Sequence, residues 1–124
     1  MNSFRNLNAY IKAKELVAEV YTLLKKFPKE EQYALCDQLR RSVVSVPSNV
    51  AEGSGRMTTK DQSHFYTMAY ASLMEVLAQL DVAYYIGYIT QEEFEHFEEL
   101  IDIEAKILTG LVNKRNSSAA STKQ

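Results

Sequence analysis

The chain has 124 residues, a formal net charge of −2, 46% hydrophobic and 24% charged residues, which indicates one globular domain with its own core. Two prolines and four glycines are too few for the many turns of a sandwich or barrel, and one cysteine excludes an intramolecular disulfide. The N-terminus lacks a signal-peptide pattern, and no window approaches the roughly 18 apolar residues of a membrane span. We therefore expect a cytoplasmic protein with no membrane partner.

The net charge hides an asymmetry between the two halves of the chain. Residues 1–60 carry ten Lys or Arg and six Asp or Glu, whereas residues 61–124 carry four and ten. A basic first half can present a basic face, or the halves can neutralise each other within one bundle.

Apolar residues recur at helical spacing in four segments, and strands have no obvious place. The sequence predicts helices over residues 8–26, 30–53, 60–87 and 91–113. Their short connections favour an all-α, antiparallel up-down-up-down four-helix bundle, forming one domain over residues 1–115. Residues 116–124 have no apolar pattern and are expected to form a disordered C-terminal tail.

Several residue types mark where these helices should begin. Pro28 is expected to start the second helix, because proline suits the first helical turn. Thr58 or Thr59 should cap the third helix. Thr90 and Glu93 have the spacing of a capping box at the start of the fourth.

Glycines and a proline mark where the helices should end or bend. Gly53 and Gly55 are expected to supply the positive φ angles that end the second helix, and Gly87 ends the third. Pro47 lacks an N–H group, which predicts a kink inside the second helix. The alternative is a true break with a new helix from Pro47; we prefer the kink because the apolar stripe keeps its phase.

The second predicted helix has a polar stripe beside its apolar stripe. The polar residues are Gln38, Arg41, Ser45, Asn49 and Glu52. A polar stripe can be buried only where its side chains find hydrogen-bond partners. We expect this stripe to hold the helix against the third helix or against a neighbouring subunit.

The third predicted helix is apolar on more than one side, which predicts burial in a subunit interface as well as in the core. Glu75 lies among its apolar residues, where a buried carboxylate is costly unless it is paired. Arg40, Arg41 or the Ser45 and Asn49 side chains are candidate partners across the bundle. The alternative is that Glu75 points to solvent.

The sequence offers no convincing catalytic, cofactor-binding or metal site, so we expect a protein that is not an enzyme. Glu93 and His96 have the Glu-x-x-His spacing of di-iron bundles. The corresponding second motif, at Asp61 and His64, has the shorter acid, and we interpret both histidines as surface residues.

Arg40, Arg41, Arg56 and Lys60 cluster in the sequence around Pro47. They could contact RNA phosphates. The alternative is that they pair with carboxylates of the same or a neighbouring subunit.

The run Ser45-Val46-Pro47-Ser48-Asn49-Val50-Ala51-Glu52-Gly53 is specific, and its order with the surrounding motifs resembles the 23S rRNA intervening-sequence protein family. The resemblance covers about residues 4–112. The motif positions, with an expected structural or interface role, are Gln38, Arg40, Arg41, Ser45, Pro47, Asn49, Glu52, Gly53, Arg56 and Glu75.

The resemblance implies a four-helix bundle that assembles into a ring-like homopentamer with no established activity. Some family members are encoded within insertions in bacterial 23S rRNA genes. A related protein, the accessory variability determinant of diversity-generating retroelements, works with a reverse transcriptase and nucleic acid. The first hypothesis is thus a homo-oligomeric scaffold or interaction protein, whose partner is itself. The alternative is binding of RNA, or of a nucleic-acid enzyme, through a basic ring of Arg40, Arg41, Arg56 and Lys60.

Overall fold

The structure, a computed structural model, describes residues 3–123, and within them it contains helices and turns but no strand. The long helices are α1 (Asn8–Leu24), α2 (Leu35–Ser54), α3 (Thr59–Ile86) and α4 (Gln91–Lys123). Two short 3-10 helices, η1 (Phe4–Asn6) and η2 (Lys29–Glu31), precede α1 and α2. The predicted all-α class with four helices is confirmed.

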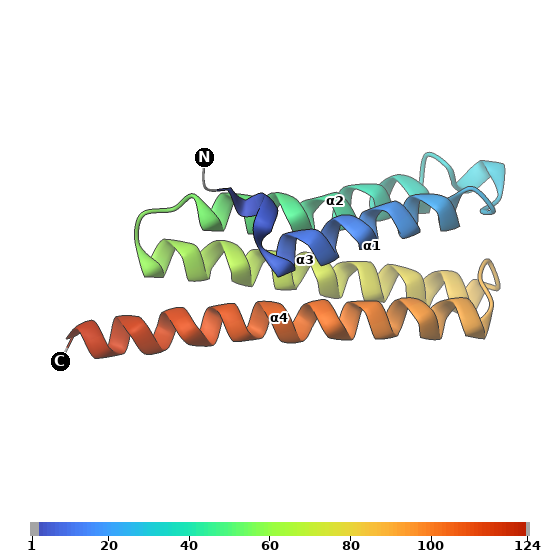
Figure 1. The fold of residues 1–124 in the computed structure, drawn as a ribbon. Coiled ribbons are helices and arrows are strands. Elements are labelled where there is room, and N and C mark those ends of the chain that lie inside the picture. Colours follow the sequence, from blue (N-terminus) through green and yellow to red (C-terminus); the bar gives the residue numbers. More distant parts are fainter. Residues whose placement is uncertain (1–2, 124) are drawn as a thin grey trace.

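The four long helices lie lengthwise beside one another (Figure 1). The α1–α2 and α3–α4 connections lie at one end of the molecule, and the α2–α3 connection lies at the other. Each of α1 and α3 packs on α2 and α4, and α1 and α3 are not neighbours. These described helices include none with the length and apolar character that a membrane crossing requires.

The core is formed by one stripe of each helix, with residues three and four positions apart. Such spacing places side chains on a single helix face. The fully buried side chains include Ala13, Leu16 and Val20 of α1, Leu39, Val43, Val46 and Val50 of α2, Tyr66, Leu73, Val76 and Leu80 of α3, and Ile101 and Leu108 of α4.

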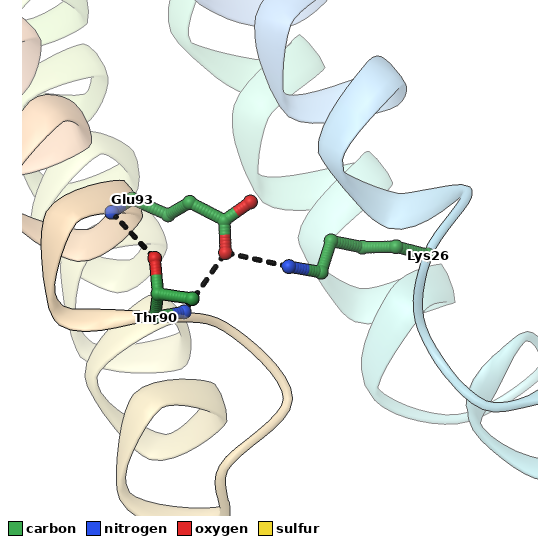
Figure 2. Close-up of polar contacts among 3 residues, drawn as sticks. All are labelled: Lys26, Thr90 and Glu93. Carbon is green, nitrogen blue, oxygen red and sulfur yellow. Dashed lines mark hydrogen bonds and ion pairs between the residues drawn. The ribbon is translucent and has the colours of Figure 1, made fainter.

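The predicted caps of α3 and α4 are confirmed. Thr58 precedes α3, and its hydroxyl accepts the N–H of Asp61 at 3.1 Å. At α4 the Thr90 hydroxyl accepts the N–H of Glu93 at 3.1 Å, and the Glu93 carboxylate accepts the N–H of Thr90 at 2.8 Å (Figure 2). Gly87 ends α3 with a φ of 99°, a left-handed conformation that favours glycine.

The start of the second helix was predicted wrongly. Pro28 opens only the short helix η2, and α2 begins at Leu35, after a non-helical Ala34. The Gln32 side chain amide donates to the carbonyls of Leu24, at 3.2 Å, and Phe27, at 3.4 Å. These bonds tie the connection to carbonyl groups at the end of α1 and hold it in a compact turn rather than in a helix.

The second helix ends within one residue of its predicted end, but the predicted conformation of the glycines there is wrong. α2 continues through Gly53 to Ser54, and Gly55 has a φ of −90°, so neither glycine supplies a positive φ. Pro47 lies inside α2, which confirms a continuous helix rather than a break; the kink stays a prediction.

The fourth helix is ten residues longer than predicted and ends at Lys123. Residues 116–123, predicted to be disordered, continue it, and Gln124 lies outside the described residues. Contacts to α3 support the extension, because Arg115 donates to Gln62 at 3.1 Å and Ser63 donates to Asn116 at 3.1 Å. Beyond them the sequence contains no Gly or Pro that would stop a helix.

Candidate functional site

Only part of the polar stripe of α2 faces α3: Ser45 and Asn49 are half-buried there, whereas Gln38, Arg41 and Glu52 are exposed. The Ser42 hydroxyl donates to the Glu75 carboxylate at 3.1 Å, and the Ser45 and Ser72 hydroxyls are 2.8 Å apart. Asn49 donates to the Ser45 hydroxyl at 3.0 Å. We call these five residues the α2–α3 seam. The seam provides Ser45 and Asn49 of the polar stripe with partners inside one chain.

Glu75 has a partner but is exposed in the single chain. The predicted partners Arg40 and Arg41 make other contacts, and it is Ser42, which the sequence did not single out, that reaches the carboxylate. Burial of Glu75 would therefore require a second molecule.

Gly53 is needed for close packing rather than for a turn. A Cβ at this position would lie 2.9 Å from Cε1 of Tyr66 and 3.1 Å from Cβ of Phe65, so the ring or the helices would have to shift to make room for it. The glycine therefore lets α2 approach the buried ring of Tyr66 at the start of α3. Arg56, just beyond it, lies over the ring of Phe65 at 4.4 Å and pairs with Glu52 at 3.3 Å.

The basic residues of the nucleic-acid hypothesis are not gathered into one patch. Arg40 is half-buried and donates to the Gln32 carbonyl at 2.8 Å, and Arg41 pairs with Asp37 at 3.3 Å. From Arg41 to the end of α2 is about 20 Å at the helical rise, and Arg56 and Lys60 lie beyond that end. Arg40 and Arg41 thus lie far along α2 from Arg56, and Lys60 belongs to α3.

An exposed stripe with apolar character follows the outer face of α3. Its residues are three and four positions apart, as in a coiled-coil seam, and all are exposed: Met68, Ala71, Glu75, Ala78, Val82 and Tyr85. The exposed fractions are 40% for Met68, 48% for Val82 and 92% for Tyr85. We call this set the α3 outer stripe. It adjoins the α2–α3 seam and shares Glu75 with it.

The model of the 23S rRNA-intervening sequence protein family matches residues 5–110. The chain belongs to this family. A solved structure from Bacteroides thetaiotaomicron, a protein of unknown function from the S23 ribosomal protein family, is similar in fold. It is 21% identical, with a TM-score of 0.79, and the alignment covers 85% of this chain and 95% of that one. No curated protein sequence matches the chain.

α4 also contains a buried carboxyl that was not predicted from the sequence. Glu104 of α4 is only 1% exposed, and neither carboxyl oxygen has a hydrogen-bond partner among the described residues. Burial raises the pKa of Glu104 to about 8, so the group is protonated at neutral pH. The spacing of Ile101, Glu104 and Leu108 on one helix face was the signal that could have revealed it.

Glu93 and His96, the Glu-x-x-His pair of α4, contact side chains of α1 and of the turn that follows it. Glu93 accepts a hydrogen bond from Lys26 at 2.6 Å as well as its capping bond from Thr90 (Figure 2). The Lys26 ammonium lowers the pKa of the Glu93 carboxyl. His96 contacts Glu19 at 2.7 Å. In the described part of the chain, no three His, Cys, Asp or Glu residues are placed to share a metal ion.

Proposed function

We propose that this protein is a non-enzymatic, self-associating, antiparallel four-helix bundle that acts as a scaffold or interaction protein. The α3 outer stripe is the observation that carries the proposal. A soluble chain rarely leaves several large apolar side chains such as Met68, Val82 and Tyr85 in water along one helix face unless another surface covers them.

The polar residues beside the stripe support the same conclusion. Ser45, Asn49 and Ser72 are half-buried in one chain, and Glu75 is exposed. Covering the α3 outer stripe would bury these groups further, and their hydrogen bonds within the α2–α3 seam would reduce the cost of removing them from water. The family resemblance suggests five copies in a ring.

Light scattering of the purified protein tests the proposal. The wild type should have a mass that is a multiple of the 14.1 kDa chain, about five-fold for a pentamer. Val82→Lys places a charge within the α3 outer stripe and should reduce the mass to that of one chain. Thr109→Lys, at an exposed position on α4, is the matched control and should keep the wild-type mass. A wild-type mass of one chain, or an unaffected Val82→Lys variant, would contradict the proposal.

Nucleic-acid binding has weaker support, because Arg41 and Arg56 are paired with Asp37 and Glu52 and lie far apart. Separate cationic groups give less focused potential than one cluster does. A titration with structured rRNA fragments at increasing salt distinguishes the two functions. Binding that survives physiological salt and weakens steeply above it would favour the nucleic-acid function.

A further inference from the structure

If copies associate as proposed above, the α3 outer stripe needs a surface to pack against, and the outer face of α1 provides one. Five exposed residues follow this face at steps of three and four: Ile11, Lys14, Ala18, Tyr21 and Lys25. We call them the α1 outer stripe. Ile11 and Tyr21 are 38% and 42% exposed, so this stripe also leaves large apolar side chains in water.

The two stripes match in spacing and in side-chain size. Both repeat at three and four residues, the pattern by which side chains of one helix fit between those of another. Alanines occupy the middle of each stripe, at Ala18 on α1 and at Ala71 and Ala78 on α3. Small side chains at these positions allow two helix axes to approach closely.

The charges of the two faces are complementary. The α3 outer stripe contains the exposed acid Glu75 and has the exposed Asp81 beside it, and the α1 outer stripe has two exposed lysines, Lys14 and Lys25. Among the described residues neither lysine forms an ion pair; Lys14 lies over the Tyr10 ring at 5.2 Å. Complementary charges favour association of these faces, whereas two α3 faces packed together would bring like charges into one interface.

The positions of the two stripes determine the kind of assembly. Because α1 and α3 are not neighbours, their outer faces lie on different sides of the chain. An interface between two different faces is heterologous, and repeated contacts of this kind close into a ring where the rotation allows. We propose that the α1 outer stripe of one copy packs on the α3 outer stripe of the next, with the lysines facing the acids, in a head-to-tail assembly.

Charge reversal of each face tests this interface, with light scattering as the readout. Glu75→Lys with Asp81→Lys should reduce the mass to one chain, and so should Lys14→Glu with Lys25→Glu. All four substitutions together restore opposite charges and should restore the wild-type mass. Glu98→Lys with Glu99→Lys, at exposed positions of α4, repeats the charge change of the first variant and should leave the mass unchanged.

The outcomes separate this inference from the proposed function. Suppose that the wild type assembles, and that Lys14→Glu with Lys25→Glu leaves its mass unchanged or the combined variant fails to recover that mass. Either result would overturn the α1–α3 interface and leave self-association intact. A wild type with the mass of a single chain would overturn both the α1–α3 interface and the proposed self-association. Circular dichroism of each variant checks that the helices are retained.

Cross-linking provides a second measurement that does not rely on charge. Ala18→Cys and Ala78→Cys place one thiol on each stripe, and a short bis-maleimide joins thiols that lie close together. Cys36 is buried and burial raises its pKa, which slows its reaction. The chain with both new cysteines should give a ladder of linked copies, and each single variant should not. Dimers from Ala78→Cys alone would show that α3 packs on α3 and would overturn the inference.

Discussion

Glu104 should make the folded chain less stable as the pH rises, and Glu104→Gln should remove this dependence. The carboxyl is 1% exposed and has no hydrogen-bond partner among the described residues, and burial raises its pKa from 4.5 to about 8. Between these values the folded chain keeps a proton that the unfolded chain has lost. The folded state binds more protons there, so the free energy of unfolding falls with increasing pH.

The size of the effect follows from the two pKa values. A change of the pKa from 4.5 to about 8 corresponds to about 5 kcal/mol in total, and about 4 kcal/mol of it falls between pH 5 and pH 9. The amide of Glu104→Gln has a similar shape and does not ionise. The variant should therefore be close to the wild type in stability at pH 5 and more stable than it by about 4 kcal/mol at pH 9.

Urea unfolding followed by circular dichroism measures this difference at each pH, at one fixed protein concentration. Glu99→Gln, at an exposed position on α4, is the matched control and should track the wild type at every pH. Subtraction of the two unfolding free energies removes the contribution of all other titrating groups. A difference between wild type and Glu104→Gln that stays constant from pH 5 to pH 9 would refute the reasoning.

Two further predictions concern the ends of helices. Gly53→Ala should destabilise the chain by about 1–3 kcal/mol, because the new Cβ meets the Tyr66 ring at 2.9 Å. Gly110 is the control, since it lies in the exposed middle of α4 and a Cβ there would have nothing within 4 Å. Gly110→Ala should stabilise the chain by up to about 1 kcal/mol. Equal effects of the two alanines on urea unfolding would argue against close packing at Gly53. Thr90→Ala removes the hydroxyl that caps the Glu93 N–H and should cost about 1 kcal/mol in the same measurement. An unchanged unfolding midpoint would mean that the cap contributes nothing.

The sequence was most informative where local chemistry decides the structure. Helical spacing located α1 and α3 closely, and the caps at Thr58 and Thr90 depend only on neighbouring residues. The role of Gly53 could not be found in this way, because it depends on the ring of Tyr66 from another helix. The length of α4 was missed because its last turns have no apolar pattern, although they contain no residue that stops a helix.

The candidate site was predicted in outline only. The polar stripe of α2 was identified, but the pairing of Ser45 with Ser72 of α3 depends on how two helices are aligned, which spacing within one helix does not determine. Arg40 and Arg56 are near each other in the sequence, but most of α2 lies between them, so a rigid helix keeps them apart. Glu104 was overlooked because it is one of many acids in α4, and its burial depends on how that helix packs against the others.

The number of copies in solution tests the central claim of self-association most directly. Native mass spectrometry of the purified wild type, checked by light scattering at two concentrations, counts the chains in each particle. We expect one dominant species with a mass about five times that of the 14.1 kDa chain. A single chain at every concentration would contradict self-association and would leave the α3 outer stripe without the partner that the account requires.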